Sequence, residues 1–231
     1  MKICYICPKF YTGEVPFFEY TQGLARLGHE VHALVTGREG EPRFEQVGGV
    51  LVERVAPDQS ASYQNFRFSF LQFLRDARTA MDRQTGWDLI NVRNLPGASL
   101  LPRFSSSGQN SIWVLEIQSP PLHTGWRSTM SNYRIRMDAK SFTTTLVHAQ
   151  DVAEEIFGLH SDRFVELPIG VDFDHFSPGK NPELRQKLGI RPEDIVFIYT
   201  GAIKPIRRLH RVIEALQLSL QTVPNLHLVL V

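Results

Sequence analysis

The sequence predicts an α/β protein built on a Rossmann-like, doubly wound parallel sheet. Apolar strands and amphipathic helices alternate from the start of the chain, where residues 2–7 and 29–36 read as strands on either side of a helix at 17–27. Gly28 stands between that helix and the second strand, where a glycine suits the left-handed residue that ends a helix. The same alternation begins again after residue 194. These observations favour two successive Rossmann-like units.

The middle of the chain continues the alternation. We expect Gly48-Gly49 to break a polar loop, and residues 66–81 to form a helix because their apolar side chains recur at helical spacing with arginines opposite. Asp151 is expected to cap a short helix. In order, the expected elements are strand 50–55, helix 66–81, strand 88–92, helix 98–104, strand 111–117, strand 143–147, helix 151–157 and strand 165–167.

A hinge is expected at Gly170-Val171-Asp172, which follows Leu167-Pro168-Ile169. The next segment is rich in proline, glycine and charge, as linkers often are. Beyond it come strand 195–200, a glycine-led loop, helix 209–220 and strand 226–231. We therefore expect a first Rossmann-like domain at 1–169, a hinge and linker at 170–192, and the truncated start of a second Rossmann-like domain at 193–231.

The composition narrows the classes of function. The chain of 231 residues has 25 Lys plus Arg against 24 Asp plus Glu, and this balance argues against a general nucleic-acid binder. No apolar run is long enough for a membrane-spanning helix, and the N-terminus lacks the pattern of a signal peptide. We expect a cytoplasmic protein that has no nucleic acid among its partners.

The two cysteines, Cys4 and Cys7, form a C-x-x-C pattern inside the first expected strand. Residues three apart in a strand point to opposite faces, so a disulfide between them is disfavoured. A second cysteine pair that could complete a zinc site is also missing from the sequence. We expect two buried free thiols rather than a redox pair, and no metal site.

The order of these segments resembles the retaining glycosyltransferases of family 4, which have two Rossmann-like domains in the GT-B fold. The resemblance spans nearly the whole chain and implies transfer of a sugar from a nucleoside diphosphate sugar to a glycan, lipid-linked or small-molecule acceptor. It implies no cofactor and no metal. The motifs that carry it are Gly28-His29-Glu30-Val31, Asp88-Leu89-Ile90-Asn91-Val92, Leu167-Pro168-Ile169-Gly170-Val171-Asp172, and Tyr199-Thr200-Gly201 followed by Arg207-Arg208 and Glu214-Ala215.

On the acceptor side, the resemblance implies roles for Gly13, Glu116 and Gln118. Gly13 lies in the loop after the first strand, where a family glycine approaches the transferred sugar and the phosphates; the alternative is an ordinary turn glycine. Glu116 and Gln118 lie at the end of strand 111–117, where relatives place an acid or a histidine near the sugar. Glu116 could equally be an ordinary buried acid.

On the donor side, the resemblance implies that Gly201, Lys204, Arg207 and Arg208 bind the nucleotide sugar. Transfer expels a diphosphate, so cations are needed where negative charge develops on the leaving oxygens. Arg208 matches the second basic position of the family, whereas Ala202 occupies the first and Lys204 is its candidate replacement. The alternative is a solvated charged loop.

The given sequence ends at residue 231, before the positions where the family has its paired glutamates and its closing strands. We therefore expect a fragment that is inactive alone and that self-associates as a homo-oligomer through an exposed sheet edge.

The alternative is a non-catalytic glycan, lipid or protein binding module. It is motivated by residues 126–140, which carry aromatic side chains and four basic residues against one acidic one and suit an anionic membrane at the inner face. A Rossmann oxidoreductase is disfavoured because the loop at 8–16 holds one glycine, not G-x-G-x-x-G.

Overall fold

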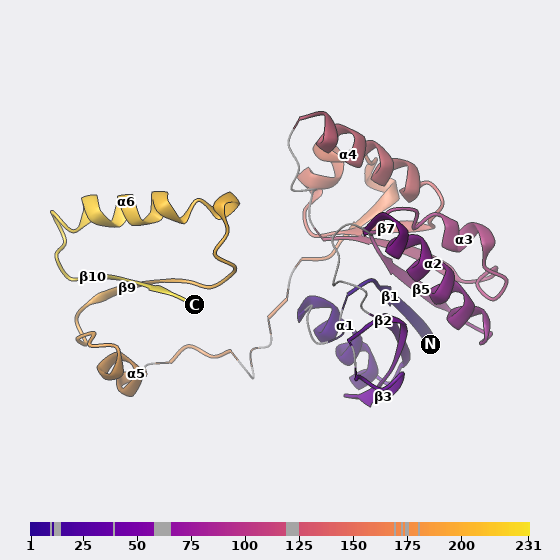
Figure 1. Cartoon of the computed structure of the whole chain (residues 1–231), viewed down its shortest axis with the longest axis horizontal. Helices are drawn as coiled ribbons and strands as arrows, with labels where there is room; N and C mark the ends of the chain where they lie inside the picture. Colours follow the sequence, from indigo (N-terminus) through magenta and orange to yellow (C-terminus); the bar gives the residue numbers. More distant parts are fainter. Residues whose placement is uncertain are drawn as a thin grey trace. The chain divides into compact units, whose positions relative to one another are not determined.

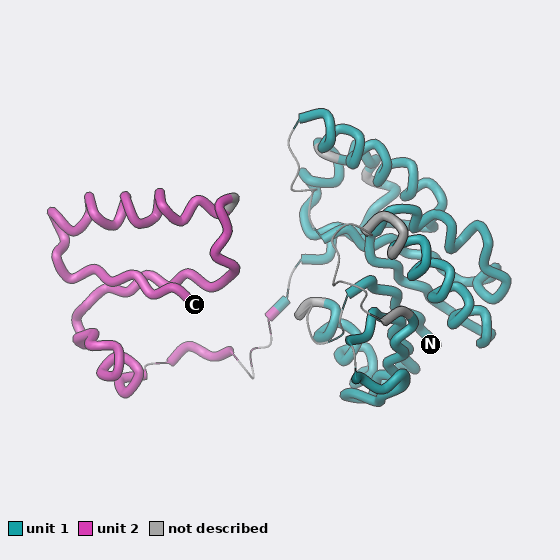
Figure 2. The backbone as a smooth tube through the Cα atoms, viewed as in Figure 1, with its two compact units in different colours: residues 1–170 teal, residues 171–231 magenta. Residues whose placement is uncertain are grey.

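The chain forms two compact units, Met1–Gly170 and Val171–Val231 (Figure 2). The division falls at the start of the segment expected to be a hinge. The structure is a computed structural model, and it describes residues 1–9, 11, 15–38, 40–57, 66–118, 125–168, 170–171, 173, 176–179 and 181–231.

Unit 1 is a sheet of eight strands in the order β3-β4-β2-β1-β5-β6-β7-β8, in which only β3 runs antiparallel to its neighbour (Figure 1). The order runs one way from β1 through β2 to β4 and the other way through β5 to β8. This confirms the predicted doubly wound α/β fold. In such sheets ligands bind beyond the carboxyl ends of the strands where the order reverses. The strands are β1 Lys2–Cys7, β2 Glu30–Gly37, β3 Phe44–Val47, β4 Val50–Pro57, β5 Leu89–Arg93, β6 Ile112–Ile117, β7 Thr144–Val147 and β8 Phe164–Glu166.

Most of the helices of unit 1 lie between two strands along the chain. Gly28 ends the first helix with a φ of 84°, and the His29 amide donates to the Leu24 carbonyl at 3.2 Å, which confirms the expected left-handed termination. Asp151 caps the short π-helix as expected, since its side chain accepts a hydrogen bond from the Val152 amide at 2.9 Å. The helices are α1 Val15–Arg26, α2 Phe66–Asp82, α3 Leu100–Phe104, α4 Trp126–Ala139, a π-helix Val152–Ile156 and a 3-10 turn Ser161–Arg163.

The segment before Val50 was expected to be a loop, and this expectation was wrong. β3 pairs antiparallel with β4, and Gly48 and Gly49 form the two-residue turn between them. Both glycines have positive φ, 57° and 85°, as a type I′ hairpin turn requires. A strand at the edge of a sheet needs no apolar face, so the polar residues of β3 hid it from an argument based on hydrophobic pattern.

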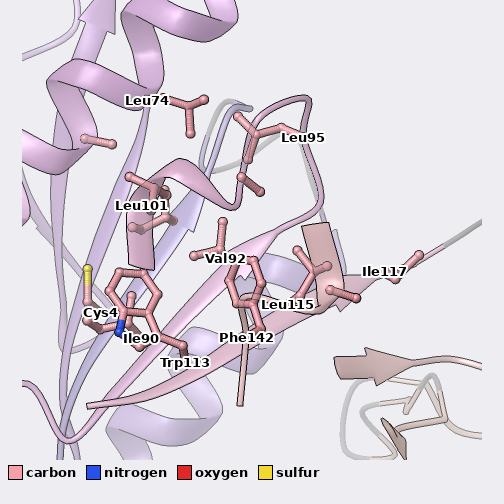
Figure 3. Close-up of a cluster of buried hydrophobic side chains, with 14 of the residues drawn as sticks. Cys4, Leu74, Ile90, Val92, Leu95, Leu101, Trp113, Leu115, Ile117 and Phe142 are labelled. Atoms are coloured by element: carbon pink, nitrogen blue, oxygen red, sulfur yellow. The ribbon is translucent and has the colours of Figure 1, made fainter. Parts of the chain in front are cut away.

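Two hydrophobic clusters lie on opposite faces of the sheet. Cys4 and Ile6 belong to the cluster that includes side chains of α2, whereas Tyr5 and Cys7 belong to the cluster that includes Phe17 of α1. Figure 3 shows the first cluster, with strand residues of β5 and β6 beside the rings of Trp113 and Phe142. Both cysteines are buried and free, which confirms the expectation of two free thiols.

Unit 2 contains one β-α-β unit. β9 Ile195–Tyr199 and β10 Leu226–Leu230 pair in parallel, and α6 Leu209–Ser219 connects them. The unit begins with α5 Pro182–Lys187, and a 3-10 turn Pro205–Arg207 precedes α6. Large apolar side chains are exposed on β9 and on α6, among them Phe197 at 55% and Leu218 at 67%.

Gly108 tests the packing of the larger cluster. An added Cβ would lie 2.6 Å from Cζ2 of Trp113 and 2.8 Å from Cδ1 of Ile90, so Gly108→Ala should lower the free energy of unfolding by about 1–3 kcal/mol. Gly23→Ala is the matched control, because the space around this helical glycine is open and alanine favours the helix by about 0.5–1 kcal/mol. Urea unfolding measures both. An unchanged midpoint for Gly108→Ala would contradict the described packing.

Candidate functional site

Polar side chains gather on the α1 face of the sheet, near the carboxyl ends of β5 and β6. Alternation along each strand puts them there: Ile90 and Val92 face the α2 cluster, so Asn91 and Arg93 face the other way. Leu115 alternates with Glu116 in the same manner along β6. The two strands are paired, with Arg93 opposite Glu116. The cluster therefore lies beside the point between β1 and β5 where the strand order reverses.

Glu116 is the centre of this cluster and is only 2% exposed. Its Oε2 atom accepts hydrogen bonds from the Tyr5 hydroxyl at 2.7 Å and from Asn91 Nδ2 at 2.8 Å. Its Oε1 atom accepts a hydrogen bond from Gln118 Nε2 at 2.7 Å. Both oxygens are thus occupied by neutral donors, and the carboxylate faces the protein interior. These surroundings favour a role in which Glu116 orients its neighbours, while the catalytic role expected from the sequence stays a prediction.

Tyr5 holds the inner side of the cluster. Burial, followed by the charge of Glu116, raises the pKa of Tyr5 well above its usual range. The phenol therefore keeps its proton and acts as a hydrogen-bond donor to the carboxylate at neutral pH.

Gln118 links the buried carboxylate to a cation. Its Oε1 atom accepts a hydrogen bond from Arg93 Nη2, while its amide nitrogen donates to Glu116. Arg93 and Gln118 are both half-buried. The two candidate residues expected from the sequence, Glu116 and Gln118, therefore belong to one hydrogen-bonded group.

Several buried polar atoms near these strand ends have no hydrogen-bond partner among the residues that the structure describes. They are the Tyr20 hydroxyl, Asn91 Oδ1, Asn94 Oδ1 and His148 Nε2. A buried polar atom without a partner is costly, so such atoms point to a ligand, an ordered water or a further protein group. Amide oxygens that accept and a phenol that donates are suited to hydroxyl groups of a sugar.

Tyr20 and His148 extend this group from two sides. The pKa of Tyr20 is raised, first by burial and then by the charge of Glu116, so its hydroxyl also stays protonated. His148 Nδ1 lies 2.9 Å from the Leu167 carbonyl oxygen, which favours the tautomer that leaves Nε2 as an acceptor. Neither Tyr20 nor His148 was predicted from the sequence as a site residue. Asn91 carried the clearest signal, because an amide inside an apolar strand needs a partner.

The expected donor-side residues lie on one loop of unit 2. Gly201 follows β9 with a φ of 144°, and its amide donates to the Val231 carbonyl at 3.0 Å. Lys204, Arg207 and Arg208 are exposed. Arg208 takes the N-cap position of α6 with a φ of 52°, in the left-handed region that an arginine rarely adopts. The structure thus brings Gly201, Lys204, Arg207 and Arg208 together at the carboxyl end of β9.

The structure does not test the expectations for Gly13, for the full hinge motif or for the metal. Gly13 is outside the described residues, as are Ile169 and Asp172 of the hinge motif. Within the described ranges, no group of three or more His, Cys, Asp or Glu side chains could hold a metal ion, and the lack of a metal requirement stays a prediction.

Comparison with known proteins identifies the kind of fold. No protein-family profile matches the chain. A D-inositol 3-phosphate glycosyltransferase from Geodermatophilus obscurus is 32% identical over 59 residues, which are 26% of this chain and 13% of that protein. The protein of the same description from Actinosynnema mirum is 30% identical over 77 residues, 32% of this chain and 18% of that protein. The matched segments thus span less than a fifth of these relatives.

Two solved structures extend the similarity to almost the full chain. Sucrose-phosphate synthase from Thermosynechococcus elongatus matches with a TM-score of 0.67 at 13% identity, over 99% of this chain and 70% of its own. A glycosyltransferase from Rickettsia africae matches with a TM-score of 0.61 at 12% identity, over 99% of this chain and 68% of its own. The fold is that of the GT-B glycosyltransferases, and the expected resemblance to glycosyltransferases is confirmed.

Glu116→Gln tests the hydrogen-bonded cluster. The amide places a donor where the carboxylate accepts, so either Gln118 or both Tyr5 and Asn91 lose their acceptor, and the free energy of unfolding should fall by about 1–3 kcal/mol. Glu166→Gln makes the same change at an exposed residue of β8 and should alter it by no more than about 0.5 kcal/mol. Urea unfolding of both variants checks this. Equal, small effects would show that Glu116 is not held as described.

Proposed function

We propose that the chain is part of a retaining glycosyltransferase of the family 4 type, which transfers a sugar from a nucleoside diphosphate sugar to a glycan, lipid-linked or small-molecule acceptor. The observation that carries the proposal is a GT-B fold along 99% of the chain, joined to sequence similarity with proteins described as glycosyltransferases. Unit 1 would hold the acceptor, and unit 2 would begin the donor side. Because the chain spans 70% and 68% of the two solved structures, we propose that these 231 residues alone do not complete a transfer.

The polar cluster of unit 1 supports the acceptor role. Asn91 Oδ1, Asn94 Oδ1 and the Tyr20 hydroxyl are buried polar atoms that sugar hydroxyls can satisfy. Glu116 would keep Asn91 and Gln118 in fixed orientations, so that the acceptor meets a preorganised surface. In a transfer with retention, the leaving phosphate would guide the acceptor on the same face of the sugar, and Glu116 would be a positioning residue.

The loop of unit 2 supports the donor role. It joins the carboxyl end of β9 to the first turn of α6, and backbone amides at the start of a helix attract anions. Lys204, Arg207 and Arg208 add three positive charges, which would stabilise the leaving diphosphate without a metal ion. The left-handed backbone of Arg208 supports this assignment, because strained residues persist where a site needs them.

Arg208→Gly separates strain from function. Glycine accepts the left-handed backbone, so the urea midpoint should stay equal or rise, while the affinity for a nucleoside diphosphate should fall by at least about tenfold. Calorimetric titration with UDP, GDP and ADP measures the affinity. Lys187→Ala removes an equal charge from the exposed last turn of α5 and should leave it within about twofold.

Four outcomes would contradict these proposals. Failure of all three nucleotides to bind, or equal weakening by both variants, would remove the donor role of the loop. Sugar transfer by the purified 231-residue chain would contradict the proposed incompleteness. Light scattering of the same samples tests self-association through the exposed apolar residues of unit 2, which a strict monomer would contradict.

A second proposal concerns α4, whose outer face suits an anionic lipid surface. Trp126, Met130, Tyr133 and Met137 are 68%, 62%, 64% and 39% exposed and follow helical spacing, so they form one apolar stripe. The exposed basic residues Arg127, Arg136 and Lys140 flank this stripe, whereas the acid of the helix, Asp138, is buried. Such a face binds headgroups through its cations and the interface through its apolar side chains.

We propose that the protein is cytoplasmic and that this face contacts the inner membrane surface. The protein would act there either as a transferase of lipid-linked acceptors or as a non-catalytic binding module. No helix in the described part of the chain is long and apolar enough to cross a bilayer. Contact through the exposed face would leave the buried side of α4, with Ile135 and Ala139, in the core of unit 1.

Vesicle sedimentation tests the α4 proposal. The chain should bind phosphatidylglycerol vesicles and not phosphatidylcholine vesicles, and Arg136→Gln with Lys140→Gln should weaken binding by about thirtyfold, since each cation near the surface contributes about 1 kcal/mol. Trp126→Ser should weaken it as well. The double change Arg26→Gln and Lys187→Gln removes two exposed charges elsewhere and should have little effect. Equal lack of binding to both vesicles would remove the membrane role.

A further inference from the structure

A pocket of about 430 Å³ lies between the loop that follows β2, the strand β4 and the helix α2. Four arginines and two acids are among the residues that line it: Arg38, Arg43, Arg54, Arg83, Glu41 and Asp76. It lies beside α2, because Asp76 and Thr79 of that helix and Arg83 directly after it line the pocket. The polar cluster around Glu116 lies on the opposite face of the sheet, so the pocket is a separate feature.

Two of the arginines are anchored on one buried carboxylate. Arg43 Nη2 lies 3.2 Å from Glu53 Oε1, and Arg83 Nη2 donates to the same oxygen. Glu53 is 2% exposed, and the side chains of Arg43 and Arg83 are 60% and 45% exposed. The inner end of each guanidinium group is therefore fixed, while the rest of it faces the pocket or solvent.

The two positive charges of Arg43 and Arg83 exceed the single negative charge of Glu53. One guanidinium group balances one carboxylate, so the second places an extra positive charge beside the first. His32 Nε2 lies 3.8 Å from Glu53 Oε2, and burial lowers the pKa of His32, so that this ring is neutral at pH 7 and leaves the balance unchanged. Two like charges held side by side at the rim of a pocket attract an anion.

Arg54 forms a fixed wall of the pocket. Its Nε donates to Glu41 at 3.0 Å, one Nη to the Pro42 carbonyl at 2.9 Å and the other to Glu45 at 2.6 Å. The second acid of the lining, Asp76, lies 3.2 Å from Arg75 Nε. Glu41 thus shares Arg54 with Glu45, and Asp76 pairs with Arg75, while within the described residues neither lining acid forms an ion pair with Arg43 or Arg83.

We propose that this pocket binds a small organic anion, whose phosphate or carboxylate group lies between the guanidinium groups of Arg43 and Arg83. Each guanidinium carries five N–H donors in a planar fork, and within the described residues one hydrogen bond to protein is made by each of these two. The volume exceeds that of an inorganic phosphate and suits a molecule of several carbons. The second oxygens of Glu41 and Asp76 can accept hydrogen bonds from its hydroxyl groups.

Calorimetric titration of the whole chain tests the proposal with glucose 6-phosphate, gluconate and inorganic phosphate as probes. At least one organic anion should bind, and more tightly than inorganic phosphate. Binding of the sugar phosphate alone identifies a phosphate site, and binding of gluconate alone a carboxylate site. The proposal does not depend on glycosyl transfer, because the readout is binding to unit 1 residues without a nucleotide.

Two variants and a control locate the binding. Arg43→Gln should weaken it by at least about tenfold, and so should Arg83→Lys, which keeps a cation for Glu53 but loses the planar fork. Arg26→Gln removes an exposed charge at the end of α1 and should have less than about a twofold effect. Circular dichroism confirms that each variant is folded.

The proposal is overturned if none of the probes binds the unaltered chain, or if Arg43→Gln and Arg83→Lys, both folded, bind as tightly as it does. Inorganic phosphate that binds as tightly as both organic anions would overturn the organic part of the proposed ligand.

Discussion

The central strand β1 is buried on both faces, and this constraint governs unit 1. It pairs in parallel with β2 on one side and with β5 on the other, and its alternate side chains enter two separate hydrophobic clusters. A slip of one residue would exchange every side chain between the clusters, so the register is strongly specified. Tyr5 carries its hydroxyl into this buried layer and needs an acceptor there, which Glu116 supplies from β6. The geometry of the candidate site therefore depends on the register of the sheet.

Two buried carboxylates, those of Glu116 and Glu53, have their negative charge compensated in different ways. Each is 2% exposed, and a buried charge must be compensated by hydrogen bonds or by an opposite charge. Neutral donors surround Glu116, so this face of the sheet holds a rigid polar surface with little charge. Arginines compensate Glu53, and they bring positive charge to the opposite face. The two faces of one sheet thereby acquire different chemistry, suited to hydroxyl groups on one side and to anions on the other.

Much of the fold could be predicted from the sequence, because hydrophobic alternation and glycine positions are local signals. The β-α-β order, the termination at Gly28 and the cap at Asp151 all depend on neighbours along the chain. β3 was missed because it lies at the edge and carries polar residues. Glu116 and Gln118 could be named because the resemblance to family 4 implies polar residues near the sugar at this strand end. Tyr5 could not, since it lies 111 residues from Glu116 and meets it only through the strand register.

The burial of both native thiols has a practical consequence for work on this chain. Cys4 and Cys7 are each 0% exposed, and burial raises the pKa of the Cys4 thiol, which disfavours the reactive thiolate. A cysteine introduced at an exposed position of either unit would then be the preferred target for a maleimide dye or spin label, with both native cysteines left in place. One label on each unit would allow the distance between them to be measured by fluorescence transfer or electron spin resonance in the folded protein.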